Sequence, residues 1–128
     1  MSKNRVHSKG KLIAHIILVS KYLKKILIGA IESKLKLLIK EICKREKCLI
    51  LAMECDIDHI HILLEYLKGL SISYIAQKLK QEITYYIRKE FKCLNSVYYN
   101  KNILWSDGYF ANSIGNVSIE TAKHYILG

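Results

Sequence analysis

Residues 54–65 read Glu-Cys-Asp-Ile-Asp-His-Ile-His-Ile-Leu-Leu-Glu, an alternation typical of a strand with two unlike faces. In an extended strand successive side chains point to opposite sides, so His59 and His61 share one face and the aliphatic residues share the other. Two neutral imidazole nitrogens suit a divalent metal ion, and Asp56 and Asp58 just upstream can add oxygen ligands. The pattern also fits a half-buried strand with two solvent-facing histidines, so both interpretations stay open here.

The length and composition indicate one globular domain, residues 1–128. Of its residues 51% are hydrophobic, enough for a core that needs neither disulfides nor a metal to fold. No apolar run approaches the ~20 residues of a membrane span, and no signal-peptide core follows the N-terminus. We therefore expect a cytoplasmic protein. The four cysteines, Cys43, Cys48, Cys55 and Cys93, show no Cys-x-x-Cys pairing, so a structural zinc site is not expected.

The charge balance favours a polyanionic partner. There are 21 Lys and Arg against 11 Asp and Glu, which gives a formal net charge of +10. An anionic membrane surface is the weaker alternative, because no strongly amphipathic terminal helix is present to insert into it. Nucleic acid is the expected partner.

The hydrophobic periodicity predicts an alternation of strands and helices. Strands are expected at residues 12–22, 48–53, 57–67 and 103–114, and helices at 29–46, 72–91 and a short stretch after Ser118. Ser71 is the expected N-cap of the helix at 72–91. This order predicts an α+β, ferredoxin-like (RRM-like) antiparallel sheet with helices packed on one face. It could place the histidine-bearing strand near the middle of the sheet.

Several residues are candidates for nucleic-acid contacts. The polar side of the helix at 72–91 interleaves cations with Tyr74 and Tyr85, and tyrosine can stack on unpaired bases. A charged helix face is as often simply solvated, so this interpretation depends on the net charge. His15 lies in the first predicted strand, where we expect a buried, hydrogen-bonded histidine. The candidate nucleic-acid contacts are Arg5, Lys21, Lys24, Lys78, Lys80, Gln81 and Arg88.

Five short motifs taken together resemble one known family. They are Val19-Ser20-Lys21-Tyr22, Asp58-His59-Ile60-His61, Leu104-Trp105-Ser106-Asp107-Gly108-Tyr109-Phe110, Ser113-Ile114-Gly115-Asn116-Val117-Ser118 and Lys123-His124-Tyr125-Ile126. Their order and spacing resemble the single-tyrosine HUH transposases of the insertion-sequence 200/605 kind. The U of that name is a bulky hydrophobic residue, here Ile60. The resemblance covers nearly the whole chain.

The resemblance implies a nuclease and strand-transfer enzyme that acts on single-stranded DNA, usually hairpin-forming transposon ends. Tyr125 matches the family's nucleophile, which forms a 5′-phosphotyrosine link. His59 and His61 match the ligands of a Mg²⁺ or Mn²⁺ ion. Relatives typically work as homodimers whose sheets join edge to edge, with the tyrosine of one subunit able to serve the histidines of the other.

The sequence departs from the family pattern at two places. The family's remaining metal ligand commonly lies one helical turn after the tyrosine, which falls beyond Gly128, so Asp56 is the expected substitute ligand. Leu23 stands where relatives often have arginine. Two alternatives to the transposase therefore stay open. One is a truncated or repurposed relative that binds DNA or RNA hairpins without cleaving them, and the other is an unrelated hydrolase whose metal activates water.

Overall fold

The computed structural model describes residues 11–113 of the chain. In this part the elements follow one another as strand, helix, strand, strand, helix, strand, with two short 3-10 helices in the connections. In chain order they are β1 (Lys11–Val19), η2 (Lys21–Leu23), α1 (Gly29–Arg45), β2 (Leu49–Cys55), β3 (His59–Leu67), α2 (Ile72–Glu90), η3 (Lys92–Ser96) and β4 (Phe110–Ser113).

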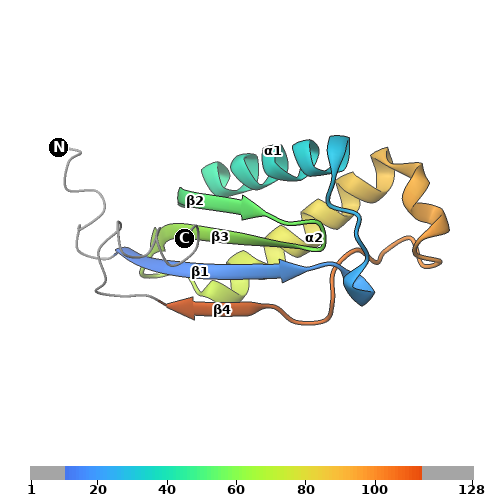
Figure 1. Cartoon of the computed structure of the whole chain (residues 1–128). Helices are drawn as coiled ribbons and strands as arrows, with labels where there is room; N and C mark the ends of the chain where they lie inside the picture. Colours follow the sequence, from blue (N-terminus) through green and yellow to red (C-terminus); the bar gives the residue numbers. More distant parts are fainter. Residues whose placement is uncertain (1–10, 114–128) are drawn as a thin grey trace.

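The described strands form one antiparallel sheet in the order β2-β3-β1-β4 (Figure 1). β3 pairs with β1 along its whole length and with β2 on its other side. The strand with both histidines is therefore interior, and β2 and β4 are the edges of the sheet as described. The predicted α+β, ferredoxin-like architecture is confirmed.

Both long helices lie on the same side of the sheet, behind it in Figure 1. The strand face that they cover is made of the aliphatic residues that alternate with the histidines, and Ile60, Ile62 and Leu64 have no exposed surface. Complete burial of such a side chain contributes about 1.5–3 kcal/mol. The core therefore holds β3 in a register that turns His59 and His61 toward the opposite face.

α2 begins where the sequence predicts. The Ser71 Oγ accepts a hydrogen bond from the backbone N–H of Tyr74 at 3.0 Å, which satisfies one of the unpaired donors of the first turn. The buried stripe of α2 continues through Ile83 to Ile87. Tyr86 follows Ile83 by three residues, a spacing that predicts a place in that stripe, but it is 46% exposed.

The strand boundaries of β2 and β3 fall within two residues of the prediction, but β1 and β4 differ more. β1 ends at Val19, because Tyr22 and Leu23 have positive φ angles of 61° and 55° that no strand accommodates. Of the predicted strand at 103–114, the structure describes residues 103–113, and within these only Phe110–Ser113 is a strand. The residues before it instead cross the end of β1, where Trp105 forms an isolated bridge with Ser20. The predicted last helix lies outside the described residues.

No helix in residues 11–113 is long and apolar enough to cross a membrane. Cys43 and Cys48 are buried, as small hydrophobic residues are. Burial raises the pKa of the Cys43 thiol to about 12 and that of Cys48 to about 11, so both stay protonated at neutral pH.

Candidate functional site

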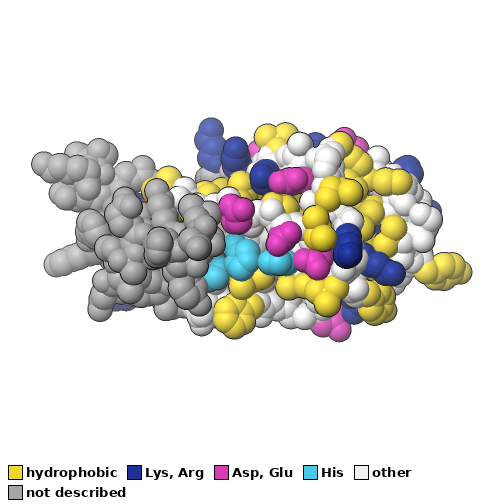
Figure 2. Space-filling view, viewed as in Figure 1, with side chains coloured by type: hydrophobic (Ala, Val, Ile, Leu, Met, Phe, Trp, Pro, Cys, Tyr) yellow, Lys and Arg dark blue, Asp and Glu magenta, His cyan; other side chains and the backbone are white. Residues whose placement is uncertain are grey.

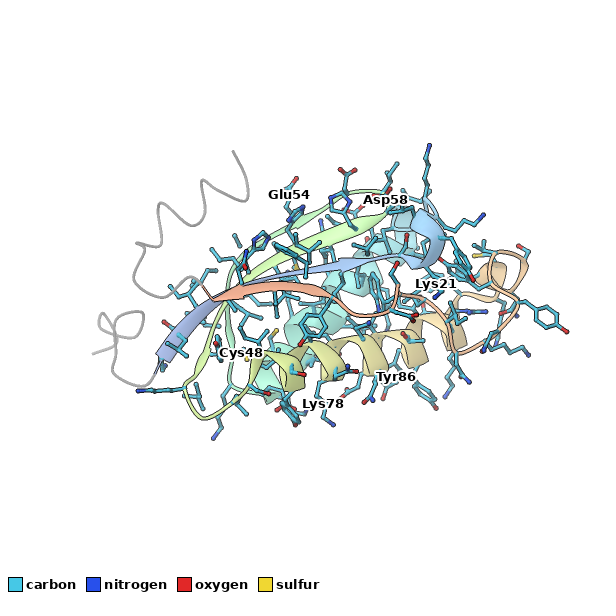
Figure 3. All side chains as sticks on the ribbon, turned by 90° about the horizontal axis from the view of Figure 1, so that it is seen from below. Lys21, Cys48, Glu54, Asp58, Lys78 and Tyr86 are labelled. Carbon is cyan, nitrogen blue, oxygen red and sulfur yellow. The ribbon has the colours of Figure 1, made fainter. Side chains whose placement is uncertain are left out.

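The two histidines of β3 lie side by side on the face of the sheet that the helices leave open. The centroids of the His59 and His61 rings are 5.0 Å apart. Figure 2 shows histidine side chains gathered in one patch with acidic side chains beside them. In Figure 3 the labelled Glu54 and Asp58 lie on the side of the sheet away from α2, from which Lys78 and Tyr86 project. The predicted pairing of the imidazoles on one face is confirmed.

Each of these histidines has its Nδ1 atom engaged by a neighbouring side chain. The Nδ1 of His59 is 2.7 Å from Oδ1 of Asp58. The Nδ1 of His61 is 3.1 Å from Nε2 of His15, a buried residue of β1. A protonated Nδ1 that donates to such a partner leaves the lone pair on Nε2. Metal-ligating histidines in proteins are commonly oriented by a second partner in this way.

The electrostatics favour neutral imidazoles. Burial, reinforced by the charge of His59, lowers the pKa of His61 below 6.5. Burial likewise lowers the pKa of His15, with a smaller contribution from His61. Glu54, which lies opposite His61 in the β2–β3 register, acts in the other direction but has a smaller effect than burial. The lowered pKa values favour neutral His61 and His15 at pH 7, and a neutral imidazole is the form that binds metal.

These donors fit a metal half-site. Two imidazoles whose Nδ1 atoms are engaged by neighbours are suitable nitrogen ligands for a divalent ion. Within residues 11–113, however, no group of three or more His, Cys, Asp or Glu is arranged to hold a metal ion. The expectation that Asp56 completes the set is corrected. Asp56 is exposed in the β2–β3 turn, where its Oδ1 accepts from the backbone N–H of Ile57 at 2.8 Å.

A basic groove of about 670 Å³ runs between α2 and the segment 101–107. Five lysines line it, and Asp107 is the one acid among the described residues of its lining. Tyr85 and Trp105 add aromatic surface. The residues of the groove that carry charge or amide groups are Lys21, Gln77, Lys80, Gln81, Arg88, Lys89, Lys92, Lys101, Asn102 and Asp107.

The groove brings together some of the predicted nucleic-acid contacts but not all. Lys21 and Gln81 line the groove, and the Nζ of Lys21 lies 3.5 Å from Oδ1 of Asp107. Lys80 donates through Nζ to the carbonyl oxygens of Ser106 and Gly108, so it also supports the groove wall. Lys24 and Lys78 lie outside the lining. Arg5 lies outside the described residues.

Arg88 is not the exposed cation that the helix pattern predicts. It is 5% exposed, and its guanidinium donates to the carbonyl oxygens of Asn100, Ile103 and Tyr98. It also donates to Oδ1 of Asn95 at 3.0 Å. Its two terminal nitrogens therefore hold the segment after η3 against α2, and the expectation of an exposed phosphate contact is corrected.

A chain of hydrogen bonds joins the groove to the histidines. Ser106, in the groove wall, donates from its backbone to Val19 at 2.7 Å and from its hydroxyl to the carbonyl of Ser20. The backbone N–H of Ser20 donates to the carbonyl of Asp58 at 2.9 Å. Asp58 in turn contacts His59. Sequence spacing alone did not indicate these supporting roles for Ser106, Ser20 and His15.

The model of the IS200-like transposase family matches residues 8–128. The chain belongs to this family. It is 28% identical over 121 residues to the transposase of insertion sequence IS200 of Salmonella typhimurium, covering 94% of this chain and 77% of that one. The IS200 transposase of Salmonella typhi matches with the same figures. The family predicted from the five motifs is confirmed.

Two solved structures share the fold of this IS200-like transposase. A candidate transposase from Deinococcus radiodurans R1 superposes with a TM-score of 0.74 at 22% identity, covering 91% of this chain and 88% of that one. A REP-associated tyrosine transposase bound to a REP hairpin gives a TM-score of 0.61 at 15% identity, covering 91% and 62%. Tyr125, the predicted nucleophile of the IS200-like chain, lies outside the described residues.

Proposed function

We propose that this IS200-like transposase cleaves and rejoins single-stranded DNA through a 5′-phosphotyrosine link to Tyr125, with Mg²⁺ or Mn²⁺ held by His59 and His61. One observation carries the proposal. Both imidazoles have Nδ1 engaged, by Asp58 and by His15, so both Nε2 atoms remain to coordinate.

The chemistry assigns one bond-forming step to Tyr125. Its phenolic oxygen loses its proton to solvent and attacks the scissile phosphorus, so that an O–P bond to tyrosine forms. The bond to the 3′ oxygen breaks, and that oxygen takes up a proton from solvent to leave as a 3′-hydroxyl. Attack by another DNA 3′-hydroxyl reverses the step and rejoins the strand without ATP. A bound Mg²⁺ or Mn²⁺ ion supplies Lewis-acid polarisation of the scissile phosphate. His59 and His61 hold the half-site on a rigid interior strand, and the lowered pKa of His61 keeps its Nε2 available to a metal.

The basic groove is the proposed binding surface for a DNA hairpin. Its lysines carry charge that neutralises phosphates, and its lining also contains amide side chains that can hydrogen-bond to DNA. The structural neighbour bound to a REP hairpin supports a hairpin as the class of ligand. Binding through phosphates is expected to weaken steeply as salt is raised.

A homodimer is part of the proposal. β2 and β4 are edge strands of the described sheet and offer unpaired backbone N–H and C=O groups to a second copy. A dimer allows Tyr125 of one subunit to serve the histidines of the other. Light scattering of the purified chain, with and without hairpin DNA, tests this expectation.

The decisive experiment is covalent capture. The full chain is incubated with single strands from the transposon ends in Mn²⁺ and analysed on a denaturing gel for a protein–DNA adduct. Adduct is expected from wild type and from the control Tyr99→Phe, which alters a fully exposed tyrosine, and not from Tyr125→Phe or His61→Ala.

Each alternative has its own result in that experiment. Hairpin binding without an adduct from any folded, metal-loaded protein would contradict the proposal and favour a relative that binds without cutting. Cleavage that needs metal but is unaffected by Tyr125→Phe would favour a hydrolase that activates water.

A further inference from the structure

The turn that follows β1, residues 20–24, holds two consecutive residues in a backbone conformation that residues other than glycine rarely adopt. Tyr22 and Leu23 have φ angles of 61° and 55°, in the left-handed region that glycine favours. The surroundings maintain it: Ser20 Oγ donates to the carbonyl of Lys24 at 2.7 Å, and Tyr98 Oη donates to that of Lys21 at 2.7 Å. Strain that the surrounding structure enforces is often found at functional sites.

The strained turn presents apolar surface to solvent. Tyr22 is 72% exposed and Leu23 is 62% exposed, whereas Ile26 and Leu27 immediately afterwards are buried. The core therefore gains little from the strained conformation. What the conformation does is hold an aromatic ring and an aliphatic side chain outward on a backbone that is hydrogen-bonded at both ends.

The neighbours of Tyr22 are cations. The Nζ of Lys21 lies 5.3 Å from the centroid of the Tyr22 ring, and Lys24 and Lys25 are exposed next in the chain. An exposed ring among positive charges suits a ligand that combines flat apolar groups with negative charge. An unpaired nucleotide has both, in its base and its phosphate. An uncharged apolar protein surface would offer no opposite charge to Lys24 and Lys25; Lys21 already has Asp107 at 3.5 Å.

The turn lies between the two parts of the candidate site. Lys21 lines the basic groove, and its backbone N–H donates to the carbonyl of Leu104 in the groove wall at 2.8 Å. On the other side, Val19 is the register partner of His59, and the backbone of Ser20 donates to Asp58. Figure 3 shows Lys21 between α2 and the sheet end that carries Asp58.

We propose that Tyr22, supported by Leu23, is a stacking platform for unpaired bases of a DNA strand that runs from the groove to the histidine pair. The inference rests on the proposed function, because it takes single-stranded DNA next to a hairpin as the ligand. It adds a residue that recognises the unpaired state of the strand without reading its sequence. Lys21 and Lys24 neutralise the phosphates on either side of the stacked base.

Equilibrium binding in EDTA tests the platform without cleavage. The probes are a DNA hairpin with an unpaired flank that contains 2-aminopurine, with the flank at either end, and the same hairpin without a flank. Stacking tolerates different bases, so the test does not need the natural target sequence. Tyr22→Asn removes the ring and keeps a residue that tolerates positive φ. Tyr22→Phe keeps the ring, and Tyr99→Asn is a control at another exposed tyrosine.

Tyr22→Asn is expected to bind the flanked hairpin about 5- to 100-fold more weakly than wild type and the unflanked hairpin equally well. It is also expected to lose the change in 2-aminopurine fluorescence that stacking produces. Tyr22→Phe and Tyr99→Asn are expected to behave as wild type. The platform is overturned if Tyr22→Asn binds the flanked hairpin normally, or if it weakens both hairpins equally.

The same samples separate this inference from the proposed function. Flank-dependent binding through Tyr22, in a chain that forms no covalent adduct in Mn²⁺, would contradict the cleavage chemistry and support the platform. If the chain forms the adduct and its Tyr22→Asn variant binds flanked DNA normally, the cleavage chemistry is supported and the platform is contradicted. If Tyr22→Asn changes only self-association in sedimentation, the turn contacts a second copy of the chain and the platform is overturned.

Discussion

Nε2 of His15 lies 3.1 Å from Nδ1 of His61, so a buried histidine of β1 orients a histidine of the neighbouring strand. The two rings are stacked with centroids 5.3 Å apart. His59 is oriented from the other direction, by Asp58 in the turn before β3. The half-site thus depends on residues that do not themselves belong to the His-x-His pair.

Replacement of His15 by phenylalanine is expected to weaken Mn²⁺ binding about tenfold, because His61 loses the acceptor for its Nδ1 proton. His15→Gln, whose amide oxygen can accept that proton, is expected to retain most of the affinity. Isothermal titration with Mn²⁺ measures both variants, and circular dichroism checks that they fold. Equal losses in the two variants would show that His15 acts only through packing.

Asp58 and Asp56 provide a matched pair of Asp→Asn variants for measuring Mn²⁺ binding. Asp58→Asn is expected to weaken Mn²⁺ binding about 10- to 100-fold, because the charge that holds the His59 tautomer is removed. Asp56→Asn is expected to leave the affinity unchanged, since that carboxylate contacts the backbone of Ile57. The same titration compares them. A larger loss in Asp56→Asn would place Asp56 among the ligands after all.

Arg88 is expected to matter for stability. Arg88→Met should lower the free energy of unfolding by about 3 kcal/mol, because several backbone carbonyls lose their donor in a buried setting. Arg88→Lys should recover little, since an ammonium group lacks the fork of the guanidinium. Urea unfolding measures the loss. Lys89→Met, at an exposed neighbour, should stay within about 0.5 kcal/mol of wild type.

The groove lysines are expected to act through phosphates. Lys89→Gln or Lys101→Gln should weaken hairpin binding for all sequences alike and reduce the slope of log K against log salt by about 1 each. Fluorescence anisotropy over a salt series measures the slope. Lys40→Gln, an exposed lysine on α1 outside the groove, should leave it unchanged.

The ion pair between α1 and α2 predicts a pH dependence. Arg45 donates to both carboxylate oxygens of Glu82, and this hydrogen bonding lowers the pKa of Glu82 below 4.5. The contribution of this ion pair to the free energy of unfolding is therefore present above pH 4.5 and is lost as the pH falls through the lowered pKa of Glu82. Because the pair is half-exposed on the Arg45 side, Glu82→Gln should cost less than about 1 kcal/mol near pH 7.

Urea unfolding of wild type and Glu82→Gln at neutral and acid pH measures this contribution. The two proteins should converge in acid, where Glu82 is protonated in both the folded and unfolded states. A difference that stays constant across the titration would mean that Glu82 contributes by packing instead.

Local sequence patterns predicted much of the fold. The alternation around His59 and the helical spacing along α2 depend only on which residues are neighbours in an extended or helical backbone, so they could be interpreted without the rest of the chain. Ser71 as an N-cap is equally local. The strand predicted for 103–114 was too long, because Ser106 and Trp105 pair with the end of β1, a contact that no local pattern contains.

By itself the sequence determined the order of elements, the shared face of His59 and His61, and the family to which the chain belongs. Tertiary structure decided which groups support those histidines and which cations remain available for DNA. Arg88 and the exposed lysines look alike on a helical pattern. They differ because only Arg88 meets the carbonyls of residues 98–103, and such contacts form only after the chain has folded back on itself.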